Sequence, residues 1–208
     1  MKHWIFVSLV CATSVAFAAQ DVKLGCKRLR VVLDARLSPD VVEHEWGSGK
    51  PRSEAPATLE LVGCKGQLLD RLVLDAPLAQ LDPVPVRGAP NPTYLVSADL
   101  TVEAGSYNGP LTIPIQVLRN HLVPVAARFA DKSIEPVFLA LTGKSAWRRV
   151  SNRHVDDLLF VSCQPKDQGF VTSYRRYFPS RQEWKVKLRT RAGLWESDGE
   201  FPSRNLFP

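Results

Sequence analysis

Residues 170–190 read FVTSYRRYFPSRQEWKVKLRT, and this stretch decides the fold class. In its second half apolar residues alternate with basic ones: Trp184, Val186 and Leu188 alternate with Lys185, Lys187 and Arg189. A period of two is typical of an antiparallel strand with one buried and one solvated face. The intervening residues 179–183 include proline and serine, which favour a turn. The stretch therefore predicts a β-hairpin with arms 170–178 and 184–190.

Short apolar runs with the same strand character follow one another along the rest of the chain, separated by turn residues. They cover residues 22–33, 58–62, 68–74, 94–102, 111–118, 121–129, 135–142 and 158–163. Lys65-Gly66 and Arg119-Asn120 are expected as hairpin turns, since glycine and asparagine tolerate positive φ. Residues 94–102 alternate most clearly and are expected to form a strand with one buried face.

Two segments depart from the strand pattern. Residues 75–92 contain five prolines, each of which removes a backbone donor, so a wrapping connection is expected there and the domain could divide at this point. Its expected packing anchors are Leu78, Leu81, Val84 and Val86. Residues 144–150 are expected to form one or two helical turns anchored by Trp147. We therefore predict a mainly β fold, an antiparallel sandwich or barrel-like domain with a short helical segment.

The N-terminus reads MKHWIFVSLVCATSVAFAAQ and is typical of a secretory signal peptide. Lys2 supplies the basic start, an apolar run follows, and Ala16-Phe17-Ala18 fits the cleavage pattern. Cleavage after Ala18 divides the chain into a signal peptide, 1–18, and a single β-rich domain, 19–208. A buried N-terminal helix and lipid attachment at Cys11 are the alternatives, but bulky Val10 disfavours the second. A short basic start favours bacterial export to the periplasm.

Four cysteines occur, and cleavage removes Cys11. In an oxidising compartment two of the remaining three are expected to pair. Proximity in sequence favours a Cys26–Cys64 disulfide, which stabilises by about 3–4 kcal/mol in the chain-entropy model. Cys163 would then be a buried thiol, although spacing alone also allows it to pair.

Positive charge is concentrated in the last third of the chain. The formal net charge is +6, and the excess of basic residues lies between Arg148 and Arg191. Such an asymmetry attracts anionic partners, either a protein or an anionic envelope component such as a phosphate-bearing polymer. Export argues against nucleic acid, and no second apolar run is long enough for a membrane span. A solvated strand face is the simpler interpretation of the same charges.

The predicted hairpin is the candidate binding surface, because aromatic and basic residues are interleaved in it. Its candidate residues are Tyr174, Arg175, Arg176, Tyr177, Arg181, Trp184, Lys185 and Lys187. Aromatic side chains bury area at interfaces while guanidinium groups bind carboxylates or phosphates. In the alternative interpretation, the aromatic residues form core and the charged residues face water.

No catalytic, cofactor or metal-binding motif is expected. Glu43-His44-Glu45 is the one local cluster of metal-ligand types, but neighbours on an extended chain point in different directions. Cys163 could form a thiol–imidazole pair with His121 or His154, although nothing in the surrounding sequence supports a nucleophile. The residues after Gly105 resemble a turn rather than a nucleophile elbow.

These features predict an exported, non-enzymatic binding protein: an envelope component, an inhibitor or an immunity-type binder. The alternative is an enzyme that acts on cell-envelope polymers through a site assembled from distant residues. A purely structural envelope protein is a third possibility. The sequence does not predict the oligomeric state.

Overall fold

The computed structural model describes residues 21–34, 55–98, 106–197 and 200–208. The predicted signal peptide, the Glu43-His44-Glu45 cluster and the end of the predicted strand 94–102 lie outside these ranges. The described chain is mainly β, with antiparallel sheets, so the predicted fold class is confirmed. The three sheets stay open, and none closes into a barrel within the described part of the chain.

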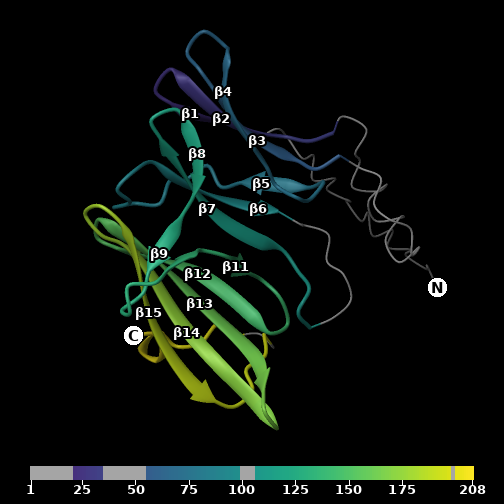
Figure 1. Cartoon of the computed structure of the whole chain (residues 1–208), viewed down its shortest axis with the longest axis vertical. Helices are drawn as coiled ribbons and strands as arrows, with labels where there is room; N and C mark the ends of the chain where they lie inside the picture. The colour runs from purple at the N-terminus through teal and green to yellow at the C-terminus, as the bar shows by residue number, and fades with distance from the viewer. Residues whose placement is uncertain (1–20, 35–54, 99–105, 198–199) are drawn as a thin grey trace, which may run out of the picture.

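The strands form three sheets, called A, B and C here (Figure 1). Sheet A is a meander of β1 (Asp21–Leu24), β2 (Lys27–Val32), β3 (Thr58–Val62) and β4 (Leu68–Val73). Sheet B has the order β11 (Leu139–Ala140), β7 (Leu111–Leu118), β6 (Thr93–Ala98) and β5 (Ala79–Leu81), and β8 (His121–Pro124) also pairs with β7. Sheet C has the order β10 (Ile134–Pro136), β9 (Ala126–Arg128), β15 (Trp184–Ala192), β14 (Gly169–Pro179), β13 (Val155–Lys166) and β12 (Ser145–Asn152). The β9–β15 pair is parallel and short, and the other pairs are antiparallel.

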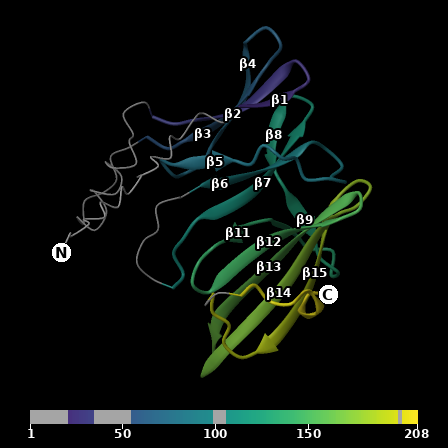
Figure 2. The same ribbon diagram turned by 180° about the vertical axis from the view of Figure 1, so that it is seen from behind.

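Sheet B lies between sheets A and C, and it contributes side chains to a core on each of its faces (Figures 1 and 2). On β6, Tyr94 and Val96 pack in the core shared with sheet A, whereas Leu95 packs in the core shared with sheet C. The expectation that this strand has one buried face was therefore wrong. Leu95 interrupts the polar set of the alternation, and a second sheet covers it.

A third core lies on the outer face of sheet C, the face turned away from sheet B. The described parts of the C-terminal segment, residues 193–197 and 200–208, include side chains that pack on this face and a 3-10 turn (Arg204–Leu206). Phe207 packs edge-on against Tyr174, with ring centroids 5.5 Å apart, and stacks on Phe201. The tail with its prolines thus has little regular structure, yet its apolar side chains hold it on the sheet.

The predicted helix at 144–150 was wrong, because residues 145–150 belong to strand β12 and residue 144 is in the turn before it. The strand pairs with β13 along its whole length, from Ser145 opposite Ser162 to Asn152 opposite Val155. Pairing with a long buried strand provides backbone hydrogen bonds and covers Trp147, so tertiary context overrides the local pattern.

The proline-rich connection also contains a short strand, β5, which the prediction excluded. Residues 79–81 fall between the prolines, so their amides remain free to pair with β6. Of the expected packing anchors, Leu78, Leu81 and Val86 are buried, but Val84 is exposed.

The predicted hairpins are confirmed at β3–β4, β7–β8 and β14–β15. At the β7–β8 turn the residue with positive φ is Arg119 rather than the expected Asn120. Cys26 and Cys64, in the β1–β2 and β3–β4 turns, form the expected disulfide, and Cys163 is a buried free thiol.

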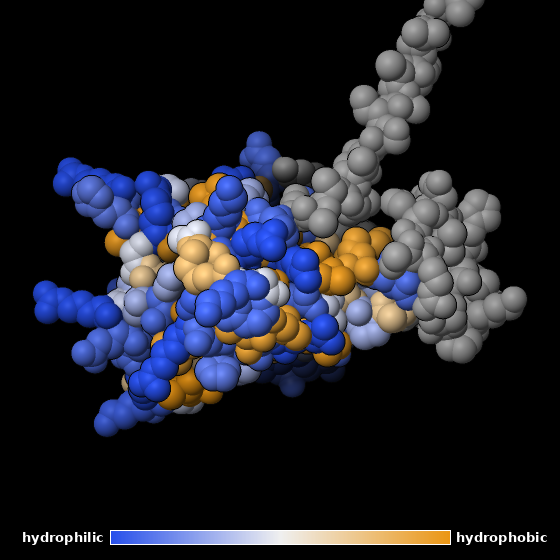
Figure 3. Space-filling view, turned by 90° about the horizontal axis from the view of Figure 1, so that it is seen from above, coloured by the Kyte–Doolittle hydropathy of each residue, from blue (hydrophilic) through white to orange (hydrophobic). Residues whose placement is uncertain are grey.

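The described residues contain no helix of the length and hydrophobicity needed to cross a membrane. Figure 3 shows the end of the molecule where sheet A lies. Hydrophobic side chains there form several separate areas, divided by hydrophilic ones. This end therefore lacks a continuous apolar surface among the residues drawn in colour.

Candidate functional site

The β14–β15 hairpin divides the predicted binding residues between the two faces of sheet C. Tyr177 pairs with Val186, and Arg176 with Lys187, so alternate residues face opposite sides. Arg175, Tyr177 and Trp184 point towards sheet B. The outer face carries Tyr174, Arg176, Lys185 and Lys187. Arg181 is exposed in the turn between the two strands.

The three aromatic residues of the predicted surface lie in the cores. Tyr174, Tyr177 and Trp184 are only 7%, 3% and 2% exposed. Burial raises the pKa of the Tyr177 hydroxyl, partly offset by the nearby Arg175 guanidinium. The aromatic residues therefore stabilise the sheet, and the basic residues remain as the candidate contact groups.

Arg175 is also separated from the other basic residues, because it faces inward. Its guanidinium lies over the ring of Phe160, 5.9 Å from the centroid, in a cation–π contact. Its Nε atom is buried and has no hydrogen-bond partner among the described residues. Arg175 therefore belongs to the interior side of sheet C.

Lys185 and Lys187 belong to a column of basic residues on the outer face of β15. This cation column consists of Lys185, Lys187, Arg189 and Arg191, at four successive outward positions. Alternate residues of a strand are about 6.7 Å apart, so the column is about 20 Å long. β9 pairs with β15 only at Trp184 and Lys185, so the rest of β15 is an open sheet edge within the described structure.

The prediction included Lys185 and Lys187 but left Arg189 and Arg191 out of the site. The missed signal was the period of two itself, which continues through the end of the strand. The predicted alternation already contained Arg189, and extending it by two more residues would have found Arg191. Their grouping depends on backbone direction and needs no tertiary contact.

Acidic groups near the column are already bound. Asp157, which is 3% exposed, accepts a hydrogen bond from Arg176 Nε at 2.9 Å and lies 3.5 Å from Arg204 Nη2. Glu183 accepts from Arg128 at 2.7 Å and is 3.7 Å from Lys185. No described carboxylate forms an ion pair with the outward, exposed Lys187 and Arg191.

The C-terminal segment covers the strands beside the column. Arg148 of β12 lies over the Phe201 ring, 4.7 Å from its centroid. Arg189 Nη1 donates to the carbonyl oxygens of Asn205 at 3.1 Å and Leu206 at 3.3 Å. Arg189 thus helps to hold the segment, whereas Lys187 and Arg191 are left to the solvent.

Cys163 lies apart from both histidines considered for a thiol–imidazole pair. His154 is in the β12–β13 turn, towards the opposite end of β13 from Cys163, and His121 is in another sheet. His121 is on β8, with Nδ1 3.5 Å from Asp70, and its side chain is largely exposed. Cys163 is on β13, where its sulfur accepts the Trp195 N–H at 3.5 Å. Within the described ranges no group of three potential metal ligands occurs.

No protein-family model, curated protein or solved structure matches the chain. We therefore infer the function from the contacts of the chain itself. Two places have relevant chemistry: the cation column and a cavity between sheets B and C.

Proposed function

We propose that this is an exported binding protein whose cation column binds an anionic component of the bacterial envelope. The column carries the proposal: Lys185, Lys187, Arg189 and Arg191 stand in a row on one strand, with few carboxylates beside them. Lysine and arginine bind phosphate and carboxylate groups through charge-assisted hydrogen bonds.

The shape of the column favours an extended ligand. A row about 20 Å long along a sheet edge can contact several charged units of one polymer chain at the same time. Each exposed contact is weak in water, since solvent and salt screen it. Several weak contacts to one chain add up through effective concentration, which a single small anion cannot exploit.

The experiment compares two charge-reversal variants of equal net charge. The test variant is Lys187→Glu with Arg191→Glu, and the control is Lys23→Glu with Lys65→Glu, two exposed lysines of sheet A. Binding to long-chain polyphosphate and to polyglutamate is measured by titration at low and high salt. We expect saturable binding that weakens with salt, at least about tenfold weaker in the test variant.

A purely solvating role for the column makes the opposite prediction. Basic side chains on an open strand edge also prevent edge-to-edge aggregation. In that case both variants bind the polyanions alike, because only net charge matters, and the proposal is rejected. If the control variant keeps binding and the test variant loses it, the proposal that the column binds the polyanion is supported.

A further inference from the structure

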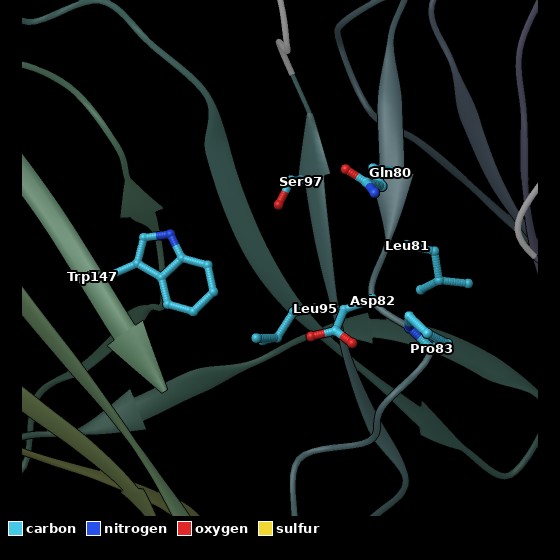
Figure 4. Close-up of a pocket in the computed structure, with 7 residues that line it drawn as sticks. All are labelled: Gln80, Leu81, Asp82, Pro83, Leu95, Ser97 and Trp147. Carbon is cyan, nitrogen blue, oxygen red and sulfur yellow. The ribbon is translucent and has the colours of Figure 1, made fainter. Parts of the chain in front are cut away.

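A cavity of about 300 Å³ opens at the edge where sheets B and C meet. It is lined by Gln80, Leu81, Asp82 and Pro83 at β5, by Leu95 and Ser97 of β6, and by Trp147 of β12. Figure 4 shows the Trp147 indole on one side of the cavity and the polar groups of Gln80, Asp82 and Ser97 on the other. β5 and β12 are edge strands, so the cavity can be reached from solvent.

Asp82 is the one charged residue among the described residues that line the cavity, and its charge is balanced by an arginine. Its Oδ2 accepts a hydrogen bond from Arg149 Nη2 at 3.0 Å, and its Oδ1 accepts from the Val84 N–H at 2.9 Å. Arg149 also donates to the Val84 carbonyl at 3.2 Å, which fixes the pair. A carboxylate has about four acceptor positions, so Asp82 can still accept from hydroxyl groups of a ligand.

Two further lining residues, Ser97 and Gln80, are polar without charge. Ser97 Oγ is 2.7 Å from Thr112 Oγ1, a hydrogen bond that orients the hydroxyl and leaves it further capacity. Gln80 is exposed, and its amide offers both a donor and an acceptor. Leu95, almost fully buried, provides an apolar floor. The balanced charge disfavours anions and isolated cations alike and leaves neutral polar ligands.

A flat aromatic wall facing a set of hydrogen-bonding groups matches one chemical class especially well. A pyranose ring has an apolar face of C–H groups, which packs on an indole, and a rim of hydroxyls that donate to carboxylates and amides. The cavity is at the small end of ligand pockets, roughly 300–1,000 Å³, and therefore suits one sugar ring rather than a long chain. We propose that this cavity binds a neutral sugar unit of a glycan, with the ring stacked on Trp147 and its hydroxyls bound by Asp82 and Gln80.

This sugar site is separate from the cation column. β12 and β15 lie towards opposite edges of sheet C, and the column is on the outer face whereas the cavity is on the face towards sheet B. The two proposals are therefore tested by substitutions at different residues. Variants of one site also serve as controls for the other.

The test uses the whole chain with two neutral trisaccharides, tri-N-acetylchitotriose and maltotriose. Binding is measured by calorimetric titration, and saturation-transfer NMR reports which sugar protons contact the protein. We expect saturable binding of at least one sugar with a Kd tighter than about 1 mM. Trp147→Ala should weaken it about tenfold or more, and Gln80→Ala to a smaller extent, whereas Trp147→Phe retains most of the affinity.

Matched variants keep the outcome interpretable. Trp195→Phe changes another half-buried tryptophan, and the Lys187→Glu/Arg191→Glu variant changes the column; both should bind sugar like the wild type. If Trp147→Ala fails to fold, Gln80→Trp fills the cavity from an exposed position and should abolish binding. Failure of both sugars to bind the wild type overturns the proposal, as does equal binding by wild type and the folded cavity variants.

Discussion

Sheets A and C each bury one carboxylate between two arginines, but the two carboxylates connect different parts of the chain. In sheet A, Glu60 of β3 accepts hydrogen bonds from Arg30 of β2 and Arg71 of β4, at 2.9 and 2.7 Å, and all three residues are in register. In sheet C, Asp157 of β13 binds Arg176 of β14, but its second partner is Arg204 of the C-terminal segment. One cluster joins neighbouring strands, and the other attaches the C-terminal segment to a sheet.

The two clusters show which charges stabilise the fold and which remain available to bind a partner. Glu60 is 5% exposed and lies directly between its arginines, so that cluster contributes to folding. On sheet C the carboxylate is taken up by Arg176 and Arg204, and the basic residues of β15 extend beyond it. A net basic composition therefore indicates a binding surface only where the cations outnumber the carboxylates within reach.

The largest loss of stability is expected from a substitution in the sheet A cluster. Glu60→Gln keeps the shape of the side chain but removes the charge that both arginines bind, so we expect the free energy of unfolding to fall by about 2–3 kcal/mol. Urea unfolding measures the change. Glu135→Gln, at an exposed strand position, is the control and should change stability by less than about 0.5 kcal/mol. Equal effects of the two substitutions would contradict a structural role for the cluster.

A smaller and more local effect is expected in sheet C. Asp157→Asn removes the charge that binds Arg176 and Arg204, which should lower stability by about 1–2 kcal/mol. Because Arg204 lies in the C-terminal segment, amide hydrogen exchange at residues 204–207 should become faster than in the wild type. Exchange that stays unchanged there would mean that apolar packing of Phe207 alone holds the segment.

The stabilising effect of Glu60 should also depend on pH. Burial alone would raise the pKa of Glu60, but the hydrogen bonds and charges of Arg30 and Arg71 outweigh it and lower the pKa below its ordinary value. The resulting stability is present above the unfolded-state pKa, about 4.3, and is lost as the pH falls through that value towards the folded-state pKa. The stability difference between wild type and Glu60→Gln should therefore shrink below about pH 4. A difference that is constant from pH 3 to 6 would show that the charge of Glu60 contributes nothing.

The features that could be predicted from the sequence depend on local periodicity. The features that were missed depend on which strands pair or pack together in the fold. The alternation in β15 and the turn at Lys65-Gly66 were sufficient to place hairpins, since register follows from a period of two. Trp147 was assigned to a helix because only its pairing with β13 reveals a strand. The cavity brings β12 together with β5 and β6, which are distant from it in sequence, so no local spacing could have indicated it.

The smallest expected effect on stability comes from the column itself. Lys187→Ala with Arg191→Ala removes two exposed cations that no described carboxylate binds, so the free energy of unfolding should change by less than about 0.5 kcal/mol. Reduced repulsion along β15 should stabilise the protein slightly, and raising the salt concentration should reduce that gain. Urea unfolding at low and high salt measures both effects. A loss of 1 kcal/mol or more would place these residues with Glu60, as structural charges, and remove the basis for a binding surface on β15.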